Sequence, residues 1–210
     1  MDTLWIMGLK DRFNEGKKWI EDHFDISAVK SKMSVFETVI RFVAGLLTCY
    51  SFTGDEMFLN KSIQVADKLL PAFDTATGIP LSLINPSLGS TSNYNWSPQG
   101  SSILSEVGTL YLEFYYLSAV TGNPVYVEKV ENIRNILNNN EKSDGLYPNY
   151  INPKTGKWGQ SKFCMIFIFI AYLYGCFDPN ISLDIFCYVF LSIFLIKFLK
   201  KIIYYYNESL

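Results

Sequence analysis

The sequence predicts an all-α fold made of repeated helical hairpins, and three observations support this prediction. Two long apolar segments, 36–53 and 103–121, are each followed by an amphipathic segment. Each apolar segment ends in Thr-Gly, and the two Thr-Gly pairs lie 68 residues apart. Loops rich in Gly, Pro and Asn separate the hairpins. Such repeats form a double-layered α/α toroid or an α-solenoid, and either requires three or more repeats to close its core.

The N-terminal segment predicts part of an earlier hairpin. Residues 4–9 are mostly apolar and are expected to be the end of a buried helix. Residues 13–20 resemble the second helix of a hairpin. The chain is therefore expected to hold two and a half hairpins and to begin inside a domain.

The first complete hairpin has clear helix boundaries. Residues 36–53 are apolar nearly all round, and such a helix must be covered on all sides. Gly54 follows at the position where a helix end requires positive φ. Asp55 can cap the next helix, 56–70, whose apolar residues fall mainly on one side, and Pro71 stands at its end.

The second hairpin repeats this pattern. Residues 103–121 are predicted to form one apolar helix that ends before Gly122. Asn123 can cap the following helix, 125–138, and Pro124 occupies the first helical position, where its missing N–H costs nothing. Each hairpin therefore pairs one inner, dry helix with one amphipathic outer helix.

The loops between the hairpins carry aromatic residues. Aromatic side chains on loops at one end of a toroid could stack on sugars, and they could equally pack onto the core. The second interpretation is the simpler one. The residues concerned are Tyr94, Trp96, Tyr147, Tyr150 and Trp158.

Few charged residues interrupt the apolar helices. Glu37 and Arg41 lie one turn apart on one helix face, and Glu106 and Glu113 are separated by two turns. If both helices are inner ones, these groups point into the lumen, where each requires a partner or a wet cavity. The alternatives are a solvated ion pair for Glu37 and Arg41, and helix-cap or loop anchoring for the two other carboxylates.

Composition excludes several classes of protein. A net charge of −2 and a pI near 5.5 exclude a basic nucleic-acid-binding surface. A single histidine, His23, excludes a His-rich metal site and disfavours a Ser/His/Asp triad. Four cysteines without CxxC spacing exclude a zinc ribbon and a disulfide scaffold.

The composition changes near Gln160. Residues 161–210 hold half of the 16 phenylalanines but only one of the 13 glycines. We therefore predict two parts, a helical body over 1–160 and an apolar tail over 161–210. Segments 163–177 and 181–199 are candidate membrane helices, although the first is short for a spanning helix.

Six segments of the body, in order, resemble the class I α-1,2-mannosidases, glycoside hydrolase family 47. The amino-acid sequence of the last segment is most similar to that of the Golgi members. The segments are 2–9, 34–41 with 45–47, 69–73 with 77–80, 100–108, 112–114, and 145–150 with 155–160.

The resemblance implies an (α/α)7 barrel, present here only in part. It also implies inverting, calcium-dependent removal of α-1,2-linked mannose from high-mannose N-glycans, which requires a proton donor and a base on opposite faces of the bond. Glu37 matches the family's acid in the Phe-Glu-x-x-Ile-Arg motif, and Arg41 and Glu106 match residues of the mannose subsite. Glu113 is expected to be structural, and His23 to lie on a helix surface. The family's disulfide lies further along, so Cys49 is expected to be a free buried thiol.

The resemblance ends near Gln160. The family's base, a key histidine and the threonine that holds Ca²⁺ belong to later segments that are not visible in this chain. We therefore expect the chain as written to be inactive. The alternatives are a non-hydrolytic glycan-binding quality-control protein of the same family, and a membrane protein in which the hairpins serve as a scaffold.

The resemblance also predicts where the protein acts. The expected location is luminal, in the Golgi or the endoplasmic reticulum, with membrane association through residues 163–199. The family's own anchor precedes the barrel, so the tail is either a genuine membrane segment or translated non-coding sequence, whose A/T-rich codons specify Phe, Ile, Tyr, Leu and Lys.

Overall fold

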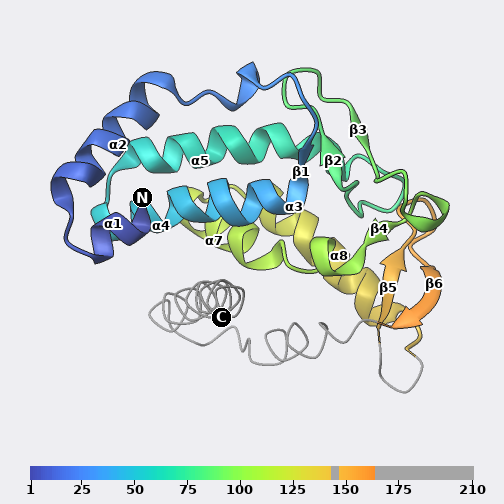
Figure 1. The fold of residues 1–210 in the computed structure, drawn as a ribbon. Helices are drawn as coiled ribbons and strands as arrows, with labels where there is room; N and C mark the ends of the chain where they lie inside the picture. The colour runs from blue at the N-terminus through green and yellow to red at the C-terminus, as the bar shows by residue number, and fades with distance from the viewer. Residues whose placement is uncertain (143–146, 164–210) are drawn as a thin grey trace, which may run out of the picture. The chain divides into compact units, whose positions relative to one another are not determined.

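The computed structural model describes residues 1–142 and 147–163, the side chains of 160–163 excepted. These residues belong to one compact unit, Met1–Phe167. Figure 1 shows that its long helices run side by side and that both small sheets lie at one end of them. The predicted membrane helices and nearly all of the predicted tail lie outside the described residues.

The N-terminal segment differs from the prediction. Helix α1, Asp2–Ile6, buries no side chain, and Ile6 and Met7 are 57% and 67% exposed. The expectation of a buried helix end is therefore wrong. The helix is too short to cover a face, because it stops before Gly8, which adopts φ +74°. Its anchor is Trp5, whose ring lies 5.0 Å from that of Phe13 in α2, Lys10–His23.

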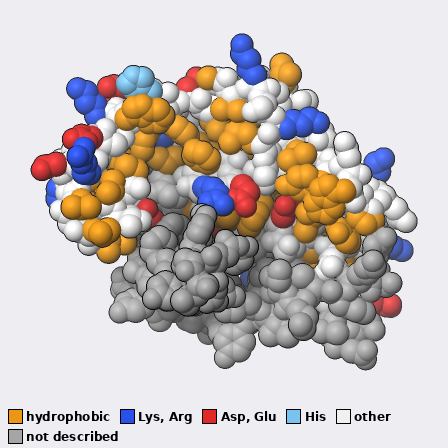
Figure 2. Space-filling view, viewed as in Figure 1, with side chains coloured by type: hydrophobic (Ala, Val, Ile, Leu, Met, Phe, Trp, Pro, Cys, Tyr) orange, Lys and Arg blue, Asp and Glu red, His pale blue; other side chains and the backbone are white. Residues whose placement is uncertain are grey.

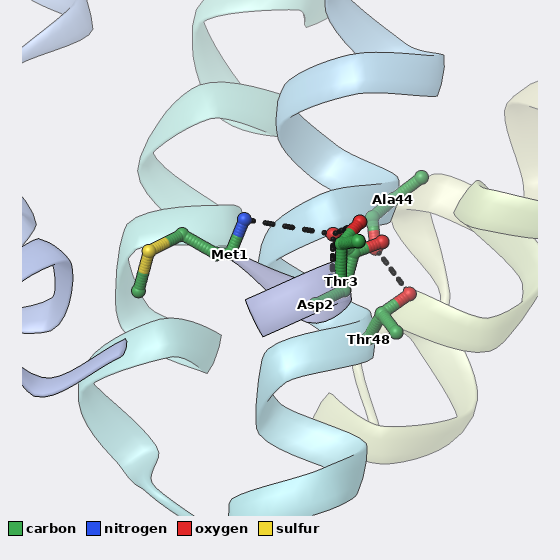
Figure 3. A network of polar contacts seen from close by, with 5 residues as sticks. All are labelled: Met1, Asp2, Thr3, Ala44 and Thr48. Carbon is green, nitrogen blue, oxygen red and sulfur yellow. Dashed lines mark hydrogen bonds and ion pairs between the residues drawn. The ribbon is translucent and has the colours of Figure 1, made fainter. Parts of the chain in front are cut away.

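A short polar network accompanies the start of the chain (Figure 3). The terminal amine of Met1 pairs with Asp2 at 3.5 Å, and the backbone N–H of Thr3 donates to the same carboxylate at 2.8 Å. Thr48 lies nearby in α4 and donates its hydroxyl to the Ala44 carbonyl at 2.8 Å. Helix α1 thus contacts α4, while its Leu4 and Trp5 are only partly exposed and its Ile6 is exposed.

The first inner helix is continuous over Val35–Thr53 but not uniform. It consists of α3, Val35–Thr38, a π-helical turn η2, Val39–Val43, and α4, Ala44–Thr53. In the π turn the Ala44 N–H donates to the Val39 carbonyl. By length and composition this helix could cross a membrane, but a buried core helix meets the same criteria, and it packs against both α5 and α7.

The first hairpin forms as predicted. Gly54 ends α4 in the left-handed conformation, at φ +68°. The Asp55 carboxylate accepts the N–H of Met57 and caps α5, Glu56–Leu69. The chain continues into a 3-10 turn η3, Leu70–Phe73, with Pro71 near its start. Another 3-10 turn, η1, Ile26–Ala28, follows α2 in the chain and packs on α5.

The second hairpin differs from the prediction in its inner helix. The segment 103–121 is not one helix but two, α6, Leu104–Val107, and α7, Tyr111–Thr121. The break spans residues 108–110 and begins at Gly108, a residue type of low helix propensity; the hydroxyl of Thr109 donates to the carbonyls of Ser105 and Glu106 at 3.1 and 3.0 Å.

The turn into the outer helix is as predicted. Gly122 has φ +70°, and Asn123 accepts the N–H of Val125 at the start of α8, Val125–Asn139. Pro124 stands immediately before the first helical residue. The α7–α8 pair therefore repeats the turn chemistry of the α4–α5 pair.

Two three-stranded antiparallel sheets, which were not predicted, accompany the predicted helices. The first sheet has the order β1-β2-β3 and the second β4-β5-β6. Most of these strands have only two residues, too few to produce a period-2 pattern that a sequence could reveal. The strands are Met33–Ser34, Leu83–Ile84, Thr91–Ser92, Ser102–Ile103, Pro148–Ile151 and Trp158–Phe163. A 3-10 turn η4, Pro98–Gly100, precedes β4.

The core lies between the two hairpins. Val39, Val43 and Phe58 are fully buried on one side, and Phe114 and Leu117 are fully buried on the other. The rings of Phe73 and Phe114, 5.5 Å apart, join the two hairpins. Coverage of the inner helices is incomplete in the described residues, because Phe42 and Tyr115 remain 37% and 38% exposed.

Two single-residue predictions are confirmed. His23 is exposed on α2 and stacks on Trp19, with ring centroids 5.8 Å apart. Cys49 is a buried free thiol, and burial raises its pKa to about 11.

Candidate functional site

The site begins where the first sheet meets the first inner helix. Ser34 ends β1 and caps α3, because its hydroxyl accepts the N–H of Glu37 at 3.2 Å. The N–H of Val35 donates to the Ser82 carbonyl at 2.9 Å, which ties this helix start to the strand region of β2. Glu37 therefore lies in the first turn of α3, which is held by the Ser34 cap and by the hydrogen bond to the Ser82 carbonyl.

Glu37 and Arg41 form an ion pair between the Arg41 Nε and a Glu37 carboxylate oxygen. The predicted contact across one helical turn is present. Both side chains are largely exposed, 46% for Glu37 and 66% for Arg41, so the pair borders solvent in the described structure. Figure 2 shows acidic and basic side chains together in the middle of this face, with hydrophobic side chains on either side.

Glu106 approaches from the second hairpin. It lies on α6 directly after β4, and one of its oxygens, Oε1, accepts the hydroxyl of Tyr94 at 3.3 Å. Its other oxygen, Oε2, is buried and has no hydrogen-bond partner among the described residues. Burial raises the pKa of Glu106, the nearby hydroxyls of Ser82 and Tyr94 oppose this rise, and the negative charge of Glu37 adds to it.

The electrostatics show that Glu37 and Glu106 share one environment. The pKa of Tyr94 is raised chiefly by burial, and further by the charges of both carboxylates. Ser34, which caps the Glu37 helix, opposes this rise by hydrogen bonding to Tyr94. Tyr94 thus hydrogen-bonds to Glu106, and the charge of Glu37 also raises its pKa.

Glu113 lies on a different helix from Glu106, although the sequence spacing predicted one helix for both. The break after Val107 places it on a separate helix from Glu106, so the two-turn spacing no longer implies a common face. Glu113 is buried in the first turn of α7, with 6% of its surface exposed. The structural role expected for Glu113 remains a prediction.

The described residues offer no ready metal site. Among residues 1–142 and 147–163 no three His, Cys, Asp or Glu side chains gather as a metal ion requires. Ca²⁺ takes six to eight oxygen ligands, several of them carboxylate or carbonyl. The oxygen donors of the described residues therefore do not fit a calcium ion.

The loop aromatic residues divide into two groups. Trp158 is anchored, because its indole N–H donates to the Glu141 carbonyl and its ring meets Tyr147 edge-on at 6.0 Å. Trp96 is different, since 63% of its surface is exposed although its ring stacks on Tyr94 at 5.1 Å. Packing onto the core explains the first group but not Trp96.

Sequence reasoning missed the residues that support the carboxylates. The sequence shows Tyr94 only as an aromatic residue of a loop, and the site residues predicted from it include neither Ser34 nor Ser82. The position of Ser34, three residues before Glu37, is a helix-capping signal that could have been used. No sequence signal links Tyr94 to Glu106, because a loop brings them together.

The site therefore contains two carboxyl groups, that of Glu37, which is partly exposed, and that of Glu106, whose pKa is raised. The family model for glycosyl hydrolase family 47 matches residues 1–168. The chain therefore belongs to glycosyl hydrolase family 47, as the sequence motifs suggested.

The relatives bear this out. The chain is 58% identical over 160 residues to "Mannosyl-oligosaccharide alpha-1,2-mannosidase IA" of Drosophila melanogaster, which covers 76% of this chain and 24% of that protein. It is 52% identical over 160 residues to "Mannosyl-oligosaccharide 1,2-alpha-mannosidase IB" of Homo sapiens, covering 76% and 25%. The chain thus spans about a quarter of the length of these relatives.

A solved structure shows the same arrangement of helices. The α-1,2-mannosidase from Trichoderma reesei superposes with a TM-score of 0.67 at 26% sequence identity. The match covers 77% of this chain and 36% of that structure. The described hairpins are therefore similar to a part of that enzyme.

Proposed function

We propose that this chain supplies the Glu37, Arg41 and Glu106 part of the glycan site of a mannosyl-oligosaccharide 1,2-α-mannosidase. The activity is the inverting hydrolysis of α-1,2-linked mannose on N-glycans. The observation that carries the proposal is the hydrogen bond between Tyr94 and Glu106, together with the effect of the Glu37 charge on the pKa of both groups. Family membership and the names of the relatives support the substrate class.

The proposed roles follow from the contacts. Glu37, at the first turn of α3, is the proton donor, and Arg41 holds it in place by the ion pair. Glu106, with its raised pKa and its buried oxygen, binds a mannose hydroxyl as a hydrogen-bond partner. These assignments rest on the motif resemblance together with this geometry.

The base and the calcium site belong, in this proposal, to family segments not matched in the 210 residues. We therefore propose that the chain alone does not hydrolyse its glycan. We also propose that the parent protein acts in the lumen of the Golgi or endoplasmic reticulum, a location that the family resemblance supports. Membrane association through residues 163–199 is part of the same proposal and lies outside the described residues.

A direct test uses the chain as it stands. The purified 210-residue protein is incubated with a high-mannose N-glycan, and released mannose is measured. We expect no release, and turnover above the level of a heat-denatured sample would overturn the proposed inactivity. Membrane extraction without glycan binding would favour a scaffold role instead.

A chimera tests the site itself. Residues 1–160 replace the matched 160 residues of the Drosophila relative, which restores a full-length catalytic chain. We expect the chimera to release mannose and Glu37→Gln to lower kcat by about 100-fold or more, the usual contribution of a general acid. The matched control is Glu56→Gln, an exposed glutamate of α5. Equal activities of the two variants would refute the role of Glu37.

A further inference from the structure

The loop that carries Trp96 is held rigidly at its base. The Asn93 side-chain amide donates to the Gly100 carbonyl at 2.6 Å, and the Asn93 oxygen accepts the N–H of Ser82 at 2.8 Å. Within the loop the Ser97 hydroxyl donates to the Ser101 carbonyl. The loop is therefore fixed to the strand region next to Glu106, and an aromatic ring on it has a defined position.

Two residues with positive φ complete this fixed turn. Gln99 has φ +53° and Gly100 has φ +66°. Gln99 has positive φ although it is not a glycine, a conformation that persists only where the surroundings determine it. A loop built this way loses little entropy when a ligand binds to it, so its exposed side chains suit recognition.

The ring of Trp96 is presented by this loop rather than buried by it. One side of the indole stacks on Tyr94, with centroids 5.1 Å apart and planes inclined by 17°. The residue nevertheless keeps 63% of its surface exposed. The exposed side of the indole is therefore accessible to a ligand.

Tyr94 connects this ring to the proposed mannose subsite. Its ring stacks on Trp96, while its hydroxyl donates to Glu106 at 3.3 Å. A single tyrosine side chain therefore connects the indole with the carboxylate. A hexose bound at Glu106 would place its neighbour within reach of the exposed indole.

We propose that Trp96 is the stacking platform for a second hexose of the glycan, adjacent to the hexose held at Glu106. The C–H bonds on one face of a hexose are weakly positive and match the negative face of an indole ring. The platform would select oligosaccharides over single sugars. This inference rests on the proposed function, because it requires a glycan at Glu106.

The test compares two sugars on the full 210-residue chain by NMR titration. Methyl α-mannoside probes the Glu106 subsite alone, and α-1,2-linked mannobiose probes both positions. We expect the disaccharide to bind more tightly, and Trp96→Ala to weaken it about fivefold while the monosaccharide affinity stays the same. Trp96→Phe, which keeps an aromatic face, should retain most of the preference.

The matched control is Trp19→Ala, because Trp19 is also exposed, at 57%, and also stacks on one ring, that of His23. It should change neither affinity. An unchanged ratio of the two affinities in Trp96→Ala would overturn the platform and leave the proposed function intact. Failure of the wild-type chain to bind either sugar would overturn both.

A second measurement uses the chimera described above. Trp96→Ala should raise KM for mannobiose about fivefold and leave kcat nearly unchanged, since the platform binds the substrate without touching the scissile bond. A fall in kcat at constant KM would contradict the platform.

Discussion

The cap of α5 offers a quantitative test of the hairpin fold. The Asp55 carboxylate accepts the Met57 N–H at 3.0 Å and pairs with Lys17 of α2. Replacing Asp55 with Ala removes both contacts, whereas Asp55→Asn keeps the cap and removes the charge. Loss of a helix cap costs about 1 kcal/mol. The ion pair, whose side chains are 34% and 27% exposed, contributes roughly 0.5 kcal/mol.

We therefore expect Asp55→Ala to lower the free energy of unfolding by about 1.5 kcal/mol and Asp55→Asn by about 0.5 kcal/mol. Urea denaturation followed by far-UV circular dichroism measures both. The second hairpin supplies the control, because Asn123 caps α8 in the same way through Val125. Asn123→Ala should cost about 1 kcal/mol, as the cap alone does.

The charge component has a defined pH dependence. The hydrogen bond from Lys17 is the main cause that lowers the pKa of Asp55 in the folded state. A carboxyl whose folded pKa is lowered stabilises the fold above its unfolded pKa, about 3.9 for Asp, and loses this contribution as the pH falls through the folded pKa. The difference between wild type and Asp55→Asn should therefore shrink below about pH 4. Equal stabilities of Asp55→Ala and Asp55→Asn at pH 7 would refute the assignment of the cap.

Three further predictions concern the turns and the core. Gly54→Ala and Gly122→Ala should each cost about 1 kcal/mol, because both positions have positive φ and a Cβ would meet no neighbour at either, so the loss is purely conformational; unequal costs in urea denaturation would contradict this. Cys49, in a variant whose other cysteines are serine, should resist a thiol reagent at pH 8 until urea is added, since burial raises its pKa to about 11. Tyr126→Phe should destabilise the fold by about 1.5 kcal/mol through loss of the 2.7 Å hydrogen bond to Asp67, and a melting temperature equal to wild type would rule this out.

The helix ends could be predicted from the sequence because their signals are local. Gly54 and Asp55 specify one turn by conformation and capping, and Gly122 with Asn123 specifies the other. The break before α7 could not be predicted, because neither Gly108 nor Thr109 is by itself a signal that ends a helix. Gly45 and Thr48, residues of the same two types, both lie within the continuous helix α4.

The site could be predicted only in part for a similar reason. Glu37 and Arg41 meet because four residues on a helix make one turn, which is a property of the sequence. Glu106 meets Tyr94 because the loop at η4 lies beside the start of α6. The position of α6 depends in turn on pairing of the two-residue strand β4 with the distant strand β5. The family resemblance named both carboxylates, but spacing alone would have placed Glu106 with Glu113.

The π turn in the first inner helix has a consequence for variation at this site. A π turn accommodates one residue more than an α-helical turn, and it lies between the segment that carries Glu37 and the segment that packs in the core. Because the wider turn takes up this extra residue, the segments on either side stay aligned almost as in a regular helix. Deletion of one residue within Val39–Val43 would therefore restore regular winding with little rotation of Glu37 relative to α4. The π turn thus lets this helix carry one residue more between the carboxylate and the segment that packs in the core.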